Sequence, residues 1–363
     1  MNMKLEPRFS DQGVGGSHSL LLYSDGTVWS MGVNNFGQLG DGTTQNHSLP
    51  QLVSGVSNVL AVSSGTTFSL ALQADGTVWG WGDNGSGQLG DGTTIKKAKP
   101  VQVTGLSEVA AISSSNAHSA ALKSDGTVWA WGNNGSGEIG DGTTTSRSKP
   151  VQVAGLSNVI AITCGNYHSV ALKSDGTVWV WGSNIFGQLG DGTKINQSKP
   201  KRVAKLSNIA AINAGIGHTL AVKLDGTVWA WGDNSSGQLG DGTKIKRTSV
   251  IQVPRLSGFS SVGAGGYSSF ALNTDGSVWA WGNNGTGQLG IGTEEVSECP
   301  TPKKILMDVR VISMESNHWF ALKEDHSVWA WGKNEFGQLG DGSMAKRISP
   351  AVVATIPPIL YEK

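Results

Sequence analysis

Asp25-Gly26-Thr27-Val28-Trp29 is the stretch that decides the fold, because the chain carries it in seven copies, two of them slightly altered: Ser277 replaces the threonine in one, and His326-Ser327 replaces Gly-Thr in the other. The other copies begin at Asp75, Asp125, Asp175, Asp225, Asp275 and Asp325, so each lies 50 residues after the one before it. A fixed period in this range is typical of solenoids, propellers and other repeat arrays. No linker interrupts the register, and we therefore expect residues 1–363 to form a single domain.

The composition limits the classes of partner and compartment. Lysine plus arginine equals aspartate plus glutamate at 27 each, which argues against a general nucleic-acid binder but leaves room for a local charged patch. Cys164 and Cys299 do not make a disulfide framework and favour a reducing compartment. Residues 1–12 lack the apolar core of a signal peptide, and no apolar run is long enough to cross a membrane. We therefore expect a cytoplasmic chain with no membrane contact. A secreted or cell-surface chain without its signal would look the same.

Within one repeat, the sequence indicates four short strands. In the fourth repeat, residues 158–164 form an apolar run rich in β-branched residues, and residues 168–173 alternate between two faces. The Asp175-Gly176 turn leads to a return strand over 177–182, and residues 201–204 form a fourth short run. Sustained helical periodicity is absent. Four strands in each of seven repeats predict an all-β fold, a seven-bladed β-propeller with four antiparallel strands per blade.

Two features predict how the blades meet and how the ring closes. Most copies carry two tryptophans on one face of the return strand, such as Trp179 and Trp181, and we expect these to pack between neighbouring blades. The inner-strand position of the first repeat is polar, whereas Ile359 near the C-terminus lies in register with the inner strands of later repeats. We therefore expect pairing of the N- and C-terminal segments to close the ring. Residues 356–363 would supply or complete the inner strand of blade one, and residues 1–8 would be an N-terminal extension.

Each repeat also contains two recurring strings, which the fourth copy shows as Gly165-Asn-Tyr-His168-Ser and Gly187-Gln-Leu-Gly190-Asp-Gly-Thr193. This pattern resembles the regulator of chromosome condensation repeat, in a bacterial type of seven-repeat array, and the resemblance covers residues 13 to about 353. The resemblance implies a seven-bladed propeller. Members of that family include the exchange factor for the GTPase Ran, a plant photoreceptor, a bacterial β-lactamase inhibitor and bacterial effectors that act on host GTPases. The constant interval leaves no room for the inserted wedge of the Ran exchange factor.

Histidines recur at one position of the repeat: His18, His118, His168, His218 and His318. Sevenfold geometry would place them in a ring, either as contacts for a partner's acidic group or as structural groups that bond a neighbouring strand's backbone. Repetition favours the structural role, because a catalytic site is usually singular. We expect no metal, since sevenfold spacing holds the rings too far apart for bonds of about 2 Å to one ion.

No residue stands out as catalytic. Ser169 follows His168 directly, so the two side chains lie on opposite faces of a strand and cannot form a nucleophile–base pair. The Gly85-x-Gly87-x-x-Gly90 string lies in a repeated loop without a following helix, which excludes a dinucleotide fingerprint. We therefore expect neither enzymatic activity nor a cofactor.

The repeats differ most in the loops that follow the Gly-Asp-Gly-Thr string. Basic side chains recur there: Lys96, Lys97, Arg147, Lys199, Arg202, Lys246 and Arg247. Since most aspartates belong to turns, we expect these cations to be the freer charges, forming a basic arc that steers an acidic protein partner. The alternative is a solvated rim that only maintains solubility. Phe36, Phe186 and Phe336 vary on the same loops and are candidate apolar contacts.

The sequence thus favours a monomeric, non-enzymatic scaffold that presents the loops of one propeller face to a protein partner. One alternative is a guanine-nucleotide exchange factor or effector that acts on a small GTPase. Another is an inhibitor-type binder of an enzyme, and a third is a structural repeat domain of a larger surface protein.

Overall fold

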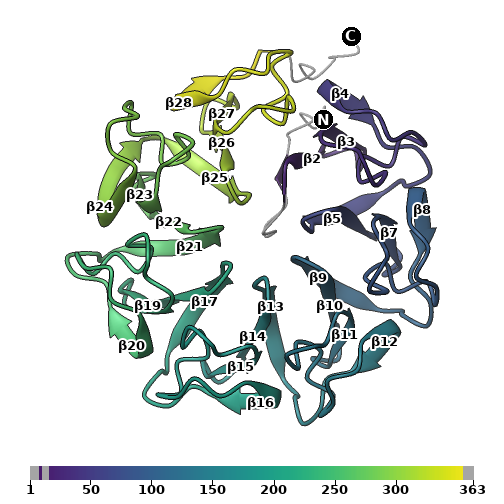
Figure 1. The fold of residues 1–363 in the computed structure, drawn as a ribbon, viewed down its shortest axis with the longest axis horizontal. Helices are drawn as coiled ribbons and strands as arrows, with labels where there is room; N and C mark the ends of the chain where they lie inside the picture. Colours follow the sequence, from purple (N-terminus) through teal and green to yellow (C-terminus); the bar gives the residue numbers. More distant parts are fainter. Residues whose placement is uncertain (1–7, 10–15, 355–363) are drawn as a thin grey trace, which may run out of the picture.

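The computed structural model describes residues 8–9 and 16–354, which form seven four-stranded antiparallel sheets around one axis (Figure 1). Each sheet is one blade, and its strands follow in chain order from the axis to the rim. These residues contain no helix, and so no helical membrane span. The prediction of an all-β, seven-bladed propeller with four strands per blade is confirmed.

The strands recur with nearly the same bounds in every blade. Blade one consists of β1 (Arg8–Phe9), β2 (His18–Leu22), β3 (Val28–Gly32) and β4 (His47–Leu52), and blade two of β5 (Val59–Ser64), β6 (Phe68–Gln73), β7 (Val78–Gly82) and β8 (Lys97–Gln102). Blade three consists of β9 (Val109–Ser114), β10 (His118–Lys123), β11 (Val128–Gly132) and β12 (Arg147–Gln152), and blade four of β13 (Val159–Cys164), β14 (His168–Lys173), β15 (Val178–Gly182) and β16 (Gln197–Arg202). Blade five consists of β17 (Ile209–Ala214), β18 (His218–Lys223), β19 (Val228–Gly232) and β20 (Arg247–Gln252). Blade six consists of β21 (Phe259–Gly265), β22 (Ser268–Asn273), β23 (Val278–Asn283) and β24 (Glu298–Leu306), and blade seven of β25 (Val309–Met314), β26 (His318–Lys323), β27 (Val328–Gly332) and β28 (Arg347–Val352).

The Asp-Gly turn joins the two middle strands of each blade except blade seven, where Asp325-His326 takes its place and His326 has a φ of 66°. In blade two, Oδ1 of Asp75 accepts hydrogen bonds from the backbone N–H of Thr77 at 2.9 Å and from its hydroxyl at 2.6 Å. Gly76 has a φ of 78°, a backbone conformation that side chains with a Cβ rarely adopt. The repeated stretch is therefore a turn device that sets the register of the hairpin.

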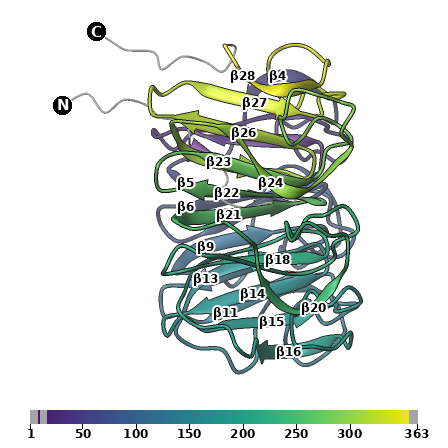
Figure 2. The ribbon, with the colours of Figure 1, turned by 90° about the vertical axis from the view of Figure 1, so that its left-hand side faces the viewer.

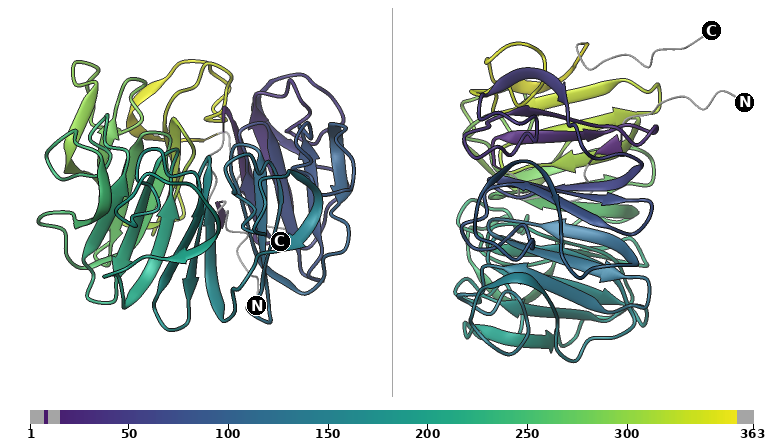
Figure 3. Two further views of the ribbon diagram at one scale, coloured as in Figure 1. Left: turned by 60° about the horizontal axis from the view of Figure 1, so that its bottom comes forward. Right: turned by 90° about the vertical axis from the view of Figure 1, so that its right-hand side faces the viewer.

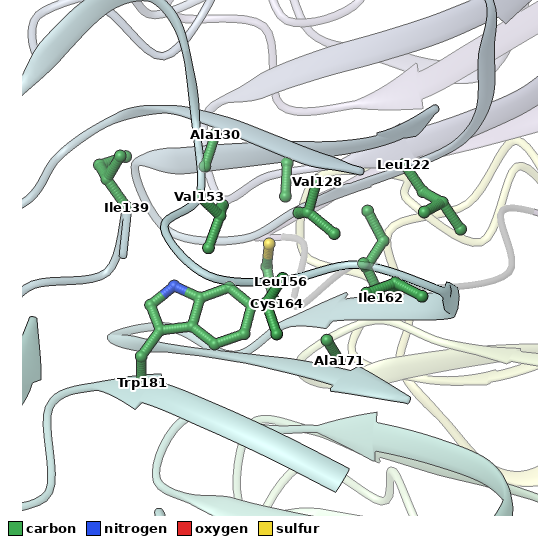
Figure 4. Packing of buried hydrophobic residues seen from close by; sticks show 12 residues of the cluster. Leu122, Val128, Ala130, Ile139, Val153, Leu156, Ile162, Cys164, Ala171 and Trp181 are labelled. Atoms are coloured by element: carbon green, nitrogen blue, oxygen red, sulfur yellow. The ribbon is translucent and has the colours of Figure 1, made fainter. Parts of the chain in front are cut away.

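The hydrophobic core lies between neighbouring blades. One cluster combines Leu122 and Val128 of blade three with Ile162 and Trp181 of blade four (Figure 4). Trp181 is fully buried, as are its counterparts in most other blades, whereas the first tryptophan of each pair is only partly buried. A Cβ added to Gly140, whose φ is 75°, would lie 2.7 Å from Nε1 of Trp181. The predicted packing of tryptophans between blades is confirmed.

The two faces of the disc carry different connections. Because the strands of a blade are antiparallel, residues 65–67 and the long loop 83–96 of blade two lie at one face. The Asp75-Gly76 turn and residues 103–108, which lead to blade three, lie at the other. We name these the loop face and the turn face, and the same division holds for every blade that has these connections. Figure 2 and Figure 3 show the strands running between the two faces.

The inner strand of blade one comes from the N-terminal side of the chain. β1 pairs with β2 through Arg8↔Leu22 and Phe9↔Leu21, and it lies beside β25 of blade seven. Arg8 is thus part of a strand, which corrects the expectation of an extension that includes it. Residues 356–363, which we expected to supply or complete this strand, lie outside the described residues, so their part in ring closure stays a prediction.

A side-chain hydrogen bond also joins the two neighbours of blade one. The hydroxyl of Ser64, at the end of β5, donates to Oε1 of Glu315, directly after β25, at 2.5 Å. Glu315 occupies the repeat position at which Gly65 and Gly165 stand in blades two and four. Blades two and seven therefore meet at the loop face, across the inner end of blade one.

Candidate functional site

The repeated histidines lie inside the junctions between blades. Nε2 of His168 is 2.9 Å from the hydroxyl oxygen of Thr219 in blade five, and this hydroxyl donates to the backbone carbonyl of Gln188 at 2.9 Å. Because the only hydroxyl hydrogen is used for the carbonyl, Nε2 of His168 must be the donor in the first bond. The indole N–H of Trp231 donates to the same carbonyl at 2.8 Å. We name this set of four residues the blade junction.

The other four histidines form the same junction, except that Met31 stands in place of the indole where blade seven meets blade one. It joins His18 to Ser69, His118 to Ser169, His218 to Ser269 and His318 to Ser19, at 2.6–3.0 Å. Each bond runs to a hydroxyl of the next blade, which corrects our expectation of a bond to a strand's backbone. The last one joins blade seven to blade one and so contributes to closing the ring.

All five rings are buried and uncharged. Burial lowers the pKa of His18, His118 and His218 to about 4. Burial is also the main cause that lowers the pKa of His168 and His318, to about 3. The neighbouring His218 and His118 contribute to this shift for His168, and His18 and Lys333 do so for His318. The side chains are at most 1% exposed, so in this conformation a partner cannot touch them. The structure therefore places them as structural groups and not as the partner contacts that we considered.

The histidine and the hydroxyl of each blade junction are as close as a nucleophile and its base, but they are not arranged as one. In each case the serine or threonine hydroxyl is buried and its hydrogen is bound to a backbone carbonyl, as for Ser69 with Gln38 and Ser169 with Glu138. A nucleophile needs its proton directed at the base and its oxygen accessible to substrate. As arranged, these pairs cannot act as nucleophiles. No group of three or more metal-ligating side chains occurs among the described residues.

The two repeats without the histidine do not open a site for a partner. Phe68 and Ser268 are both fully buried. In blade seven, Trp319 replaces the hydroxyl that would face a histidine of blade six, and its ring lies 5.7 Å from that of Phe270 and 5.6 Å from that of Trp331. Both of these positions are therefore filled by an aromatic side chain, Phe68 in blade two and Trp319 beside blade six.

Several of the predicted basic residues are paired within their own loop. Lys97, Arg147 and Arg247 form ion pairs with the aspartate six residues before them, at 3.7, 2.6 and 2.6 Å. Burial raises the pKa of Asp141, but hydrogen bonds from Thr143 and Arg147 outweigh it, and the pKa lies below its usual value. The prediction that the basic side chains are the freer charges is thus wrong for these three residues, and also for Lys246, which forms an ion pair with Asp233 at 3.2 Å.

The remaining basic residues are divided between the two faces. Arg202 is paired in register with Trp179 at the turn-face end of blade four and acts electrostatically on Asp175, so it does not belong to the loop face. The stem of Lys199 covers Gly142 of blade three, where a Cβ would lie 2.7 Å from its Cε. Lys96 is exposed at the tip of its long loop. Within the described part of the chain, neither Lys96 nor Lys199 forms an ion pair.

The three predicted phenylalanines all lie on the loop face. Phe36 is exposed. Phe186 is half-buried, because its ring lies against Gly217 of blade five and beneath the ammonium group of Lys246, 4.2 Å from the ring centre. Phe336 is half-buried beside Lys333, whose ammonium group is 5.7 Å from the ring centre. Of the three, Phe36 is therefore the most exposed, at 38%.

The sequence interpretation missed most of the exposed apolar side chains on this face. Ile95, Ile195 and Ile245 occupy one position of the long loop in blades two, four and five and are 64%, 67% and 60% exposed. Tyr167 and Ile185 of blade four are 41% and 56% exposed. The signal was present in the sequence, since an isoleucine stands two positions after the Gly-Asp-Gly-Thr string in three repeats, within a stretch that is otherwise polar. The loop face is thus more apolar and less basic than we expected.

Comparisons with known proteins identify relatives of this fold. The family described as the RCC1-like domain matches residues 4–316, and the regulator of chromosome condensation (RCC1) repeat matches residues 325–360. Human protein RCC2 is 44% identical over 48 residues, which are 13% of this chain and 9% of that protein, so this chain matches about a tenth of the curated relative.

Solved structures share the whole architecture. The crystal structure of human WBSCR16 has a TM-score of 0.81 and 25% identity, covering 92% of this chain and 95% of that one. Yeast RCC1 (Prp20) bound to Kap60 has a TM-score of 0.80 and 21% identity, covering 97% of this chain and 85% of that one. A second structure, of Prp20p from Saccharomyces cerevisiae, described with its binding to Gsp1p and histones, has a TM-score of 0.80 and 21% identity over 96% and 87% of the two chains. Because the family match extends over most of the sequence and the repeat match covers much of the rest, the chain belongs to the RCC1-like domain family.

Proposed function

We propose that this protein is a non-enzymatic interaction module that presents its loop face to a protein partner. The observation that carries the proposal is a group of exposed apolar side chains on the loops of this face, although others, such as Leu60, Ile160 and Leu224, are exposed at the turn-face end of the blades. Phe36, Tyr167, Ile185, Ile195 and Ile245 all lie on the loop face, on connections that a rigid ring holds in place. Loops on a rigid scaffold are the usual site of recognition, and exposed apolar groups within a polar surround are typical of protein interfaces.

A rigid support lowers the cost of binding at this face. In blade four the backbone N–H of Phe186 donates to Oε1 of Gln188 at 2.9 Å, and the side chain of Asn184 bonds the loop to Asp191 and Thr193. The same bonds recur in most of the other long loops. Loops that are ordered before binding lose little conformational entropy when a partner docks.

Small GTPases are the first class of partner to test. The yeast relative is described with its binding to Gsp1p, and the repeat resembles that of exchange factors for small GTPases. Exchange of nucleotide is thus the second candidate function, and it shares the loop-face surface with the first.

A panel of purified small GTPases, each loaded with a fluorescent nucleotide, tests both functions. Capture on the immobilised chain without faster nucleotide release would support the interaction module, and faster release would support the exchange factor. Ile195→Ser on the loop face should weaken capture about tenfold, as expected for the loss of a central apolar contact. Leu224→Ser is the matched control, because Leu224 is 76% exposed on the turn face. Equal loss of capture in both variants would contradict the assignment to the loop face, and no capture by any member would exclude the tested GTPases.

A further inference from the structure

Blade four differs from the other blades in the apolar character of its loop-face positions. It has Tyr167 in the first connection, Ile185 and Phe186 in the long loop and Ile195 near the end of that loop. At the same four positions blade three has Ala117, Gly135, Ser136 and Thr145, and blade five has Gly217, Ser235, Ser236 and Ile245. Only blade four has a large apolar side chain at all four positions.

Hydrogen bonds bring these positions together. The backbone N–H of Ser183 donates to the carbonyl of Tyr167 at 2.7 Å, which fixes the first connection beside the start of the long loop. The backbone N–H of Asn184 donates to Oδ1 of Asn196 at 2.8 Å, which fixes the start of that loop beside its end. Ile185 and Ile195 each neighbour one member of this bonded pair. The four apolar positions therefore form one group, on segments of the loop face that lie next to one another.

Blade five extends this group across the junction. Lys246 lies over the ring of Phe186 and forms an ion pair with Oδ1 of Asp233 at 3.2 Å. Its neighbour in the chain is the exposed Ile245. We name Tyr167, Ile185, Phe186, Ile195 and Ile245 the blade-four patch.

Around the patch the ammonium groups are more exposed than the carboxylates that pair with them, including Lys244 and Glu298 beside Ile245, at 54% and 25%. The carboxylates of Asp191 and Asp233 are almost completely buried, whereas the lysines paired with them, Lys201 and Lys246, keep 44% and 40% of their side chains exposed. Lys194 precedes Ile195 directly and is exposed. Among the described residues Lys194 forms no ion pair. A partner approaching the patch therefore meets ammonium groups around an apolar centre.

We propose that the blade-four patch is the binding hot spot of the loop face and that it takes an acidic polypeptide segment with apolar side chains. Apolar anchors would occupy the centre, and carboxylates would lie against Lys194, Lys201 and Lys246 at the edge. The inference rests on the proposed function, since it specifies where a protein partner docks on that face and what chemistry it presents.

A phage-displayed library of random 12-residue peptides, selected on the immobilised full-length protein, is the probe. We expect the selected peptides to be enriched in aspartate and glutamate together with aromatic or aliphatic residues. Their affinity should fall about tenfold or more for Ile195→Ser and for Lys194→Glu, as for the loss of a hot-spot residue. Ile95→Ser is the matched control, because Ile95 occupies the same repeat position in blade two with nearly the same exposure, and it should change the affinity less than about twofold. Unchanged melting curves verify that the variants are folded.

The outcomes separate this inference from the proposed function. Peptides that bind through the blade-four patch while the GTPase panel gives no capture would leave the inference standing and remove only the GTPase class. Equal weakening by Ile195→Ser and Ile95→Ser, enrichment of basic or uncharged peptides, or no enrichment at all would overturn the inference. Retention on phosphatidylserine vesicles that depends on Ile195, without any selected acidic peptide, would assign the patch to a lipid surface instead.

Discussion

Mild acidification should unfold this propeller, because five histidines are buried in their neutral form. The pKa values of His18, His118 and His218 are lowered to about 4, and those of His168 and His318 to about 3, from 6.5. A histidine whose folded-state pKa is lowered binds its proton only in the unfolded chain. Its contribution to stability is thus fully present above pH 6.5 and is lost as the pH falls towards the folded-state value.

The magnitude follows from the size of these shifts. One pKa unit corresponds to about 1.4 kcal/mol, so a histidine shifted from 6.5 to about 4 loses about 2 kcal/mol of stabilisation between pH 8 and pH 5. The five together lose about 10 kcal/mol, which is comparable with the whole free energy of unfolding of a typical domain, about 5–15 kcal/mol. Aspartates with lowered pKa values act in the same direction only below about pH 4. The loss of stability between pH 6.5 and 5 is therefore assigned to the histidines, since the buried Glu138, whose pKa burial raises, acts in the opposite direction.

Urea unfolding followed by tryptophan fluorescence at pH 8, 6.5, 5.5 and 5 measures the effect. We expect the midpoint to fall steeply below pH 6.5 and the native baseline to disappear near pH 5. His168→Gln is the control, because the amide of glutamine can donate to Thr219 but does not titrate, so the pH dependence should weaken by about a fifth. A midpoint that stays constant from pH 8 to 5, or a pH dependence that His168→Gln leaves unchanged, would refute the reasoning.

Three further predictions concern packing and ring closure. Trp181→Ala should lower the free energy of unfolding by about 3–5 kcal/mol in urea titrations. Trp179→Ala should lower it by clearly less, since Trp181 is completely buried and Trp179 only partly. Gly140→Ala should lower the free energy of unfolding by at least about 1–2 kcal/mol, because Gly140 has a positive φ and a Cβ would contact the indole of Trp181. Gly135→Ala should be nearly neutral, because a Cβ there would meet nothing closer than 3.8 Å. Equal effects at the two glycines would contradict this prediction. Deletion of residues 356–363 should lower the melting temperature sharply in calorimetry, and an unchanged melting curve would show that the tail does not close the ring.

The repeat alone was enough to predict the architecture. The 50-residue period, the Asp-Gly turn and the alternation around Trp179 and Trp181 each depend on residues that are close together in the sequence. The spacing between copies then determines the number of blades. Local patterns of this kind are what single-sequence reasoning detects well.

The partners of individual side chains could not be predicted in the same way. His168 bonds a hydroxyl 51 residues further along, on the next blade, and such a contact depends on the angle between blades rather than on local periodicity. Lys97 and Arg147 were counted as free cations, but the path of the long loop returns each of them to an aspartate six residues earlier. The sequence shows which residues are charged but not which of them the folded loop brings together. The number of unpaired cations in the basic arc was therefore overestimated.

The blade junction also limits how such a chain can be recombined during evolution. Every blade with a histidine and a hydroxyl at these positions offers the same donor to the blade after it and the same acceptor to the blade before it, so most repeats are interchangeable parts. Three blades are exceptions: blade two has Phe68 and blade six has Ser268 in place of the histidine, and blade seven has the bulky Trp319 in place of the hydroxyl. Shuffling that separates blades six and seven would place Trp319 against the histidine or phenylalanine of another blade. Blades six and seven should therefore be inherited as one unit, while single copies of repeats one, three, four and five are gained, lost or exchanged.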